Sequence, residues 1–162
     1  MALFETCKSG AEPPEDNIFA RIIRREEPAE VVYEDDVLIA FKNSRPASTV
    51  HLLVVPKKGA VRSAAFLTAE HVDLLENMVA TGQQLLKERA GLTENQQVAQ
   101  ASLGFHMPPF TMVPHVHLHA IAPVSKMSGW NKLVFLKGSP WYHTADELLT
   151  RLRSQQTAHI TL

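Results

Sequence analysis

Apolar residues recur along the chain at two spacings, about two and about 3.6 residues. The shorter spacing is typical of strands, which are expected over 31–34, 37–42, 51–56, 98–105 and 115–121. In the third of these segments the apolar run is nearly continuous. It therefore indicates a strand that is buried on both faces of a sheet.

The longer spacing predicts helices over 17–27, 68–90 and 144–153. Asn17 is a candidate N-cap for the first helix, and Thr68 for the second, which Gly91 ends. We interpret the apolar stripe of this long helix as core packing. The segment 144–147 has the form of a capping box that opens the last helix. Since strands come in adjacent pairs and helices in separate blocks, the pattern predicts an α+β fold with an antiparallel sheet.

Composition fits an ordinary globular domain and excludes several classes of protein. The 162 residues are 45% hydrophobic and 20% charged, enough for one domain with a buried core. Sixteen Lys and Arg against seventeen Asp and Glu leave a net charge of −1, so the chain lacks the positive field of a non-specific nucleic-acid binder. No apolar run approaches the roughly 20 residues of a membrane span, and we expect no secretory signal at the start. A single cysteine, Cys7, excludes an internal disulfide framework and a zinc site built on cysteine pairs.

Three of the eight histidines, His115, His117 and His119, lie within five residues. In a strand their side chains point to one face, and the apolar residues between them point to the other face, into the core. The spacing alone leaves three explanations open: a zinc site with an open fourth position, nucleophilic and acid–base chemistry by imidazole, and a structural cluster. The nearest acidic residues in the sequence are distant, which weakens the zinc explanation.

The stretch His115–Ile121 resembles the signature of the histidine triad (HIT) family of nucleotide hydrolases and transferases. Further blocks match the Hint branch of that family in order, over about residues 17–153; they are 17–23, 32–36, 46–58, 104–110 and 141–146. The resemblance implies the HIT fold, an antiparallel sheet of about five strands with one long and one short helix packed on it. The domain would span 17–154, between a flexible N-terminal tail over 1–16 and a C-terminal tail over 155–162.

The resemblance also implies hydrolysis of nucleoside 5′-phosphoramidates in two steps, with adenosine the expected base and without a metal or cofactor. His117 would attack the α-phosphorus with one ring nitrogen, while a backbone carbonyl accepts a hydrogen bond from the other. His115 would orient the site, and His119 and His51 would contact the phosphate oxygens. Water would then release the nucleotide from His117.

Residues expected at the nucleotide come from three further segments. Ile18, Phe19 and Ile22 would form an apolar wall for the nucleoside, and the Asn43–Ser44 loop would approach the ribose. Three residues before the triad, many relatives carry a serine that assists the leaving group. This chain has Met112 there, with Thr111 beside it as the candidate substitute. We hypothesise that a hydrophobic Met112 tolerates bulkier or more apolar amine leaving groups.

Other positions also depart from the family pattern. Asn17–Ala20 stands where many Hint relatives carry Cys-x-x-Cys, so no thiolate zinc site is expected there. Asn43 replaces the usual aspartate at the ribose, and its amide offers one acceptor and two donors. Gly59 stands where relatives often have histidine. Because these changes spare His117, we expect hydrolysis to survive, slower or on a shifted substrate.

The implied partners are purine nucleoside monophosphate derivatives and a second copy of the chain, with the long helix from Thr68 as the candidate dimer contact. Neither a membrane nor a nucleic acid is expected. The expected location is the cytoplasm, with the nucleus as a further one. The alternatives are a dinucleoside polyphosphate hydrolase or nucleotidyl transferase, and a catalytically weak nucleotide-binding or scaffold protein.

Overall fold

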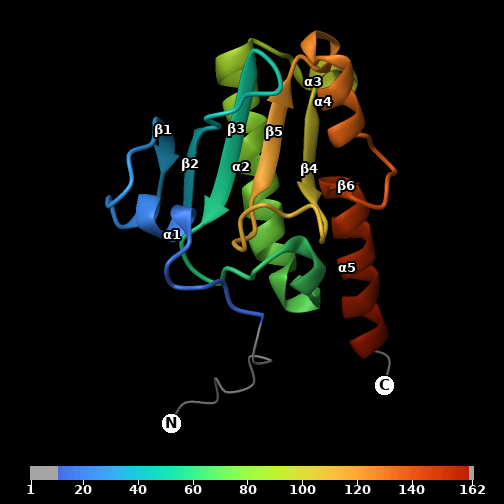
Figure 1. Cartoon of the computed structure of the whole chain (residues 1–162). Coiled ribbons are helices and arrows are strands. Elements are labelled where there is room, and N and C mark those ends of the chain that lie inside the picture. The colour runs from blue at the N-terminus through green and yellow to red at the C-terminus, as the bar shows by residue number, and fades with distance from the viewer. Residues whose placement is uncertain (1–10, 161–162) are drawn as a thin grey trace.

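The computed structural model describes residues 11–160, which form one sheet with helices on both faces (Figure 1). The helices are α1 (Ile18–Ile23), α2 (Val72–Ala90), α3 (Glu94–Gln100), α4 (Gly129–Val134) and α5 (Ala145–Ile160). The strands are β1 (Val31–Glu34), β2 (Leu38–Lys42), β3 (Val50–Pro56), β4 (Ser102–His106), β5 (Leu118–Ala122) and β6 (Tyr142–Thr144). Short 3₁₀ turns span Ala64–Phe66, Ala69–His71 and Val124–Lys126. Cys7 and most of the expected N-terminal tail lie outside the described residues.

The six strands lie in the order β1-β2-β3-β5-β4-β6, and every neighbouring pair is antiparallel. The predicted fold class, α+β with an antiparallel sheet, is confirmed, and the short β6 adds a strand to the about five expected. β5 is central, between β3 and β4. In this register His119 lies opposite Leu53 of β3 and Gly104 of β4.

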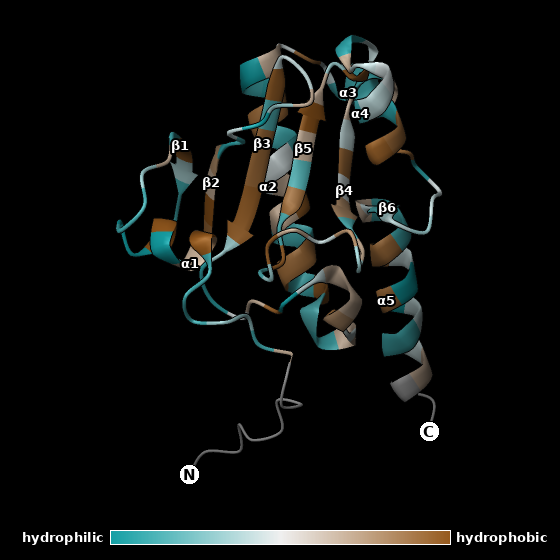
Figure 2. Cartoon of the chain, viewed as in Figure 1, coloured by the Kyte–Doolittle hydropathy of each residue, from teal (hydrophilic) through white to brown (hydrophobic). Residues whose placement is uncertain are grey.

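The sheet buries apolar side chains on both faces, and β2 and β3 are hydrophobic along most of their length (Figure 2). On one face, Leu52 and Leu118 belong to the main core with Leu75 of α2 and with side chains of α5. On the other, Leu53 and Val55 pack with α1. The predictions of a doubly buried third strand and of core packing along α2 are therefore confirmed.

The predicted helix starts are also confirmed. Asn17 caps α1, its Oδ1 accepting from the backbone N–H groups of Phe19 and Ala20. Thr68 caps a 3₁₀ turn that leads into α2, which ends at Gly91 with a φ of +65°. Thr144 and Glu147 form the capping box of α5, with Thr144 N–H donating to Glu147 Oε2 over 2.8 Å.

Several element boundaries differ from the predicted ones. The first helix ends at Ile23 and does not reach residue 27, because Arg25 adopts a φ of +63°. The strand expected over 98–105 is wrong at its start: α3, opened by its own Thr93 capping box, runs to Gln100, and β4 follows. The last helix continues to residue 160, so the described part of the expected C-terminal tail is helical.

The strand expected over 115–121 begins only at Leu118. Pro114 has no N–H to donate to a ladder. The next two N–H groups bond outside the sheet, that of His115 to the Val113 carbonyl and that of Val116 to the Val61 carbonyl. The first two histidines of the triad therefore lie on an extended loop that leads into β5.

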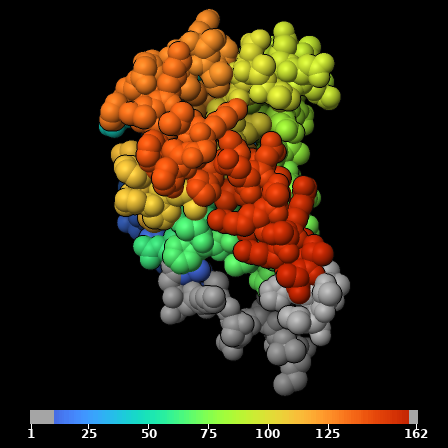
Figure 3. Space-filling view, turned by 90° about the vertical axis from the view of Figure 1, so that its right-hand side faces the viewer, coloured from blue at the N-terminus to red at the C-terminus, as the bar shows by residue number. Residues whose placement is uncertain are grey.

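Viewed from the right-hand side of Figure 1, α4 and the chain after it (orange) lie at the upper left, the chain around α3 (yellow-green) lies at the upper right, and α5 (red) extends below them (Figure 3). Among the described residues, no helix is both long enough and apolar enough to cross a bilayer.

Candidate active site

β5 and the loop before it present the three triad histidines on the sheet face opposite α2. Val116 and Leu118 between them, and Ala120 after them, belong to the main core beneath α2. His115 and His119 are buried, and His117 is partly exposed. The predicted alternation of imidazole and apolar side chains is confirmed, although only His119 lies within the regular strand.

His117 has one ring nitrogen bonded and one open. Its Nδ1 lies 2.7 Å from the carbonyl oxygen of His115. Because a carbonyl can only accept, Nδ1 carries the proton and Nε2 the lone pair. Within residues 11–160 the structure gives Nε2 no hydrogen-bond partner, and the Phe19 ring lies edge-on to the imidazole with centroids 5.0 Å apart. Burial lowers the pKa of His117 to about 4, against the opposing effect of the His115 carbonyl, so the ring is neutral and nucleophilic at pH 7.

His51, His119 and His106 form a row of imidazoles beside His117. His51 Nε2 lies 2.9 Å from His119 Nδ1, and His119 Nε2 lies 3.2 Å from His106 Nδ1. Burial lowers the pKa of all three rings, that of His51 to about 3, and the neighbouring histidines lower the pKa of His51 and His119 further. Both nitrogens of His119 are therefore bonded to other rings. Contact of His51 and His119 with phosphate oxygens stays a prediction, and it requires these hydrogen bonds to open.

His51 is fixed by the loop before β3. The backbone N–H of Ala47 donates to His51 Nδ1 over 2.9 Å, so the proton of the neutral ring is on Nε2. Asn43 Nδ2 lies 3.2 Å from that Nε2, and Asn43 Oδ1 accepts from the N–H of Arg45. Two donors cannot bond to each other. The Asn43 amide therefore presents a donor beside His51.

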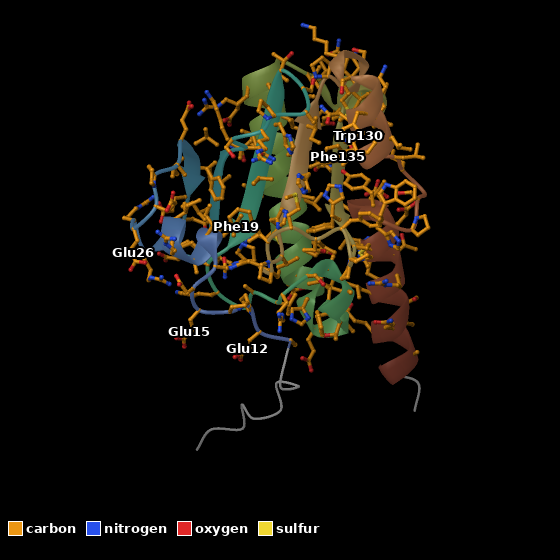
Figure 4. The ribbon with its side chains drawn as sticks, in the orientation of Figure 1. Glu12, Glu15, Phe19, Glu26, Trp130 and Phe135 are labelled. Carbon is orange, nitrogen blue, oxygen red and sulfur yellow. The ribbon has the colours of Figure 1, made fainter. Side chains whose placement is uncertain are left out.

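Two aromatic residues at this site, His106 in the row and Phe135 beside it, were not assigned from the sequence. His106 ends β4, two positions after Gly104, and so shares the face of His119 once β4 pairs with β5. In the sequence His106 falls within the matching block 104–110 without an assigned role, and the strand pairing places it beside His119. Phe135, at the end of α4, places its ring 5.5, 4.8 and 5.2 Å from those of His51, His106 and His119. In Figure 4, Phe19 and Phe135 approach β3 and β5 from two sides.

His115 is held by two partners that orient its ring. Its Nε2 lies 2.8 Å from the Pro56 carbonyl and its Nδ1 lies 3.3 Å from Asn17 Nδ2. The carbonyl only accepts, so Nε2–H donates to it and Nδ1 accepts from the Asn17 amide. Burial lowers the pKa of His115, against the effect of the Pro56 carbonyl. This histidine therefore connects α1 to the end of β3.

The residues expected at the nucleotide divide into two groups. Phe19 lies against His117, and Asn43 lies against His51. Ile22 is buried in the core between α1 and the sheet, with Leu53 and Val55 of β3. Ile18, next to Phe19, is 45% exposed.

The leaving-group candidates and Ser44 lie at the surface or near it. Thr111 Oγ1 donates to the His106 carbonyl over 3.4 Å, Met112 is 87% exposed, and Ser44 is exposed. No hydrogen bond joins these three side chains to the triad rings in the described part of the structure. Their roles stay predictions.

The triad rings are not arranged as one set of metal ligands. His115 and His119 have both ring nitrogens bonded to other groups, and Nδ1 of His117 bonds to a carbonyl. Over residues 11–160, no group of three His, Cys, Asp or Glu side chains could hold a metal ion. The geometry favours imidazole chemistry over a three-histidine metal centre.

The chain is similar to known proteins of the histidine triad family, in agreement with the resemblance found in its sequence. The family model described as "Scavenger mRNA decapping enzyme C-term binding" matches residues 16–134. The adenosine 5′-monophosphoramidase HINT3 of Xenopus tropicalis is 40% identical over 138 residues, 85% of this chain and 87% of that protein. The protein of the same name from Mus musculus is 40% identical over 138 residues, 84% and 81% of the two chains. A solved HIT family hydrolase of Legionella pneumophila Philadelphia 1 is 31% identical, with a TM-score of 0.58, and covers 65% of this chain and 90% of its own.

The names of two of these relatives also support a more specific resemblance of two segments of the sequence. The segments 104–110 and 141–146 resemble histidine triad nucleotide-binding protein 3, and the two relatives in frog and mouse carry the name HINT3. In the structure both segments meet at the end of β4, where the N–H of Met107 donates to the Trp141 carbonyl over 2.9 Å.

Proposed function

Because the chain belongs to the histidine triad family, we propose that it hydrolyses nucleoside 5′-phosphoramidates and releases adenosine 5′-monophosphate and an amine. The observation that carries this proposal is the open Nε2 of a neutral His117, with the ring proton held on Nδ1 by the His115 carbonyl. The relatives named adenosine 5′-monophosphoramidase support the choice of substrate.

The reaction divides one displacement into two. His117 Nε2 attacks the α-phosphorus, the phosphorus–amine bond breaks, and the amine leaves with a proton from solvent. The imidazole then carries the nucleotide and a positive charge, which the His115 carbonyl stabilises through Nδ1–H. Water attacks the phosphorus, the phosphorus–Nε2 bond breaks, and the proton lost by the water balances the one taken by the amine.

The nucleotide is placed by groups on both sides of His117. Phe19 offers its ring next to the attacking imidazole, and the Asn43 amide offers a donor suited to a ribose hydroxyl oxygen. His51 and His119 carry their protons on nitrogens within the row of imidazoles. When a phosphate oxygen replaces a neighbouring ring as acceptor, these N–H groups stabilise the charge that develops on it.

The leaving amine is the part of the substrate for which the chain offers the fewest polar side chains. Met112 is exposed where many relatives carry serine, and Thr111 donates to a backbone carbonyl. We therefore expect a preference for apolar amines. In a Met112→Ser variant, turnover of small polar phosphoramidates should rise relative to large apolar ones, and an unchanged ratio would contradict this role.

A homodimer is part of the same proposal and rests on the family resemblance. α5 covers one side of α2, where Arg153 and Glu76 are 2.6 Å apart, so the dimer contact would use another side of α2. Light scattering over a range of protein concentrations tests this, and a monomer throughout would exclude it.

Rapid quench with an α-³²P-labelled adenosine phosphoramidate tests the mechanism. Label should appear on the protein before AMP is released, and His117→Ala should abolish both. His143→Ala is the matched control, because His143 pairs with Phe105 and lies on the opposite face of the sheet from the triad. Turnover of a panel of dinucleoside polyphosphates tests the alternative function, that of a dinucleoside polyphosphate hydrolase. Nucleotide binding without turnover would identify a binding protein and refute the proposal.

A further inference from the structure

The net charge of −1 conceals an uneven distribution of charge along the chain. Residues 95–145 contain three lysines, Lys126, Lys132 and Lys137, and no Asp or Glu. The rest of the chain holds all seventeen acidic residues and thirteen basic ones, a net charge of −4. The segment 95–145 includes β4, β5 and β6, which are neighbours in the sheet, and α4, which His106 of β4 contacts at the Val134 carbonyl. The part of the sequence without acidic residues is therefore also one region of the structure.

The side of α4 that faces away from the sheet is apolar. Phe135, directly after the helix, packs against three imidazoles of the site, which fixes the side of α4 that faces the sheet. Trp130, Leu133 and Leu136 follow one another at a spacing of three residues, and they are 72%, 48% and 48% exposed. At this spacing side chains share one side of a helix, and the Leu136 N–H continues the turn by donating to the Leu133 carbonyl.

Two further aromatic residues extend this apolar side of α4 towards the loop after β4. Trp141 Nε1 donates to the Leu133 carbonyl over 3.1 Å, and the ring of Phe110 lies 6.0 Å from that of Trp141. Figure 3 shows α4 and the chain after it at the surface of this flank. We call the five side chains the α4 face; they are Phe110, Trp130, Leu133, Leu136 and Trp141. Several exposed apolar side chains that adjoin one another are typical of an interaction surface.

The three lysines beside the α4 face have no anionic partner in the described part of the chain. Lys126, Lys132 and Lys137 are all exposed, and none of them belongs to an ion pair within residues 11–160. Lys132 lies within α4, and Lys137 directly follows Leu136. Exposed Trp and Leu side chains with solvated lysines beside them are the pattern of a helix that lies at an anionic membrane surface.

We propose that the α4 face binds the surface of a membrane that contains anionic lipids. Its apolar side chains lie at the level of the headgroups, where tryptophan is enriched in proteins, and the lysines lie against the negative charge. Each lysine near such a surface strengthens binding about fivefold. A second copy of the chain fits this face less well, because a twofold contact brings the same three lysines of both copies together. The inference does not depend on the proposed function.

Cosedimentation with phosphatidylcholine vesicles, with and without phosphatidylserine, tests the proposal on the whole chain. Wild type should sediment with vesicles that contain phosphatidylserine and not with pure phosphatidylcholine, and added salt should release it. Tryptophan emission should shift to shorter wavelength on binding, because both tryptophans belong to the α4 face. Absence of binding to both kinds of vesicle, or equal binding to both, overturns the proposal.

Variants of Trp130 test the apolar part of the contact. Trp130→Ala should lower the partition coefficient about tenfold, the effect of one large apolar side chain, and Trp130→Phe should stay within about threefold of wild type. Phe66→Ala is the control, because Phe66 is an exposed aromatic residue outside the segment 95–145. Equal losses in Trp130→Ala and Phe66→Ala overturn the proposal. Should Trp130→Ala fail to fold by circular dichroism, Leu136→Ala takes its place with the same expectation.

A matched pair of lysine variants tests the charge. Lys132→Glu should lower the partition coefficient at least about fivefold. Lys58→Glu changes the net charge equally and should have a smaller effect, because Lys58 is exposed beyond the end of β3, whereas Phe135 contacts His51 near the start of that strand. Equal losses in the two variants overturn the proposal.

Two further measurements would identify a different partner for the α4 face. Light scattering without vesicles detects a second copy, and fluorescence anisotropy of a labelled single-stranded oligonucleotide detects nucleic acid. Self-association or oligonucleotide binding that Trp130→Ala abolishes, in a protein that does not bind vesicles, overturns the proposal in favour of that partner.

Discussion

Asn17 is the residue whose replacement the structure allows us to analyse most fully. Its side chain is buried at the start of α1 and uses both of its polar atoms. Oδ1 accepts from two backbone N–H groups, those of Phe19 and Ala20, both over 3.0 Å. Nδ2 donates to the Pro14 carbonyl over 2.7 Å and lies 3.3 Å from the accepting Nδ1 of His115. One side chain thus caps a helix and holds the first triad ring.

In Asn17→Ala, both contributions are lost. Removing an asparagine N-cap costs about 1 kcal/mol. Removing the two bonds made by Nδ2 costs about 1 kcal/mol each, because the Pro14 carbonyl and the buried His115 Nδ1 lose their donor. The free energy of unfolding should therefore fall by about 3 kcal/mol. Asn17→Ser keeps an oxygen that can cap α1 but has no amide, so it should lose about 2 kcal/mol.

Urea unfolding, followed by far-ultraviolet circular dichroism, measures these differences. With an m-value of about 1–3 kcal/mol/M, the alanine variant should unfold at a urea concentration about 1–3 M lower than wild type. A loss below about 1 kcal/mol in Asn17→Ala would refute the reasoning as a whole. Equal losses in the serine and alanine variants would refute the capping contribution.

Three further predictions concern the sheet, acid stability and the ribose. In Gly104→Ala the new Cβ would lie 2.6 Å from the His143 carbonyl oxygen, so the free energy of unfolding should fall by about 3 kcal/mol. Gly129→Ala, whose Cβ meets nothing within 4 Å, is the control and should change it little in the same urea titration. Because burial lowers the pKa of His51 to about 3 and of His117 to about 4, the unfolded chain binds more protons between pH 6.5 and pH 4. The free energy of unfolding should therefore decrease as the pH is lowered over this range, by more than about 1.4 kcal/mol per pH unit near pH 5. A free energy of unfolding that does not change with pH would contradict neutral buried rings. Asn43→Asp restores an acceptor for ribose hydroxyls, so KM should fall for a ribonucleoside phosphoramidate and not for its 2′,3′-dideoxy counterpart; equal changes in KM would argue against contact with the ribose.

What the sequence predicted correctly depends on short-range rules. The alternation of faces in an extended chain places the three triad histidines on one side, and that rule holds even where the loop before Leu118 is not paired. The caps at Asn17 and Thr144 follow from side-chain oxygens that reach backbone N–H groups within three residues. These interactions are decided locally, so the sequence alone contains them.

The position of His106 beside His119 depends on long-range pairing, whereas the sequence placed it only in the matching block 104–110, without a role. His106 approaches His119 only because β4 pairs with β5 and places Gly104 opposite His119. The strand boundary predicted there was itself wrong, since α3 occupies the residues up to Gln100. Phe135 had no signal at all, because it lies at the end of α4, an element that the hydrophobic pattern did not reveal.

The three triad rings differ in the hydrogen bonds that hold them, and this difference is the reason why the proposed mechanism assigns the nucleophile to only one of them. His115 uses both nitrogens on the Pro56 carbonyl and Asn17, and His119 uses both on His51 and His106. His117 is bonded on Nδ1 alone, by the carbonyl of His115. A neutral imidazole attacks through the nitrogen that carries its lone pair. Since the lone pairs of His115 and His119 already accept hydrogen bonds, Nε2 of His117 is the triad nitrogen that can form a bond to phosphorus without first losing a partner.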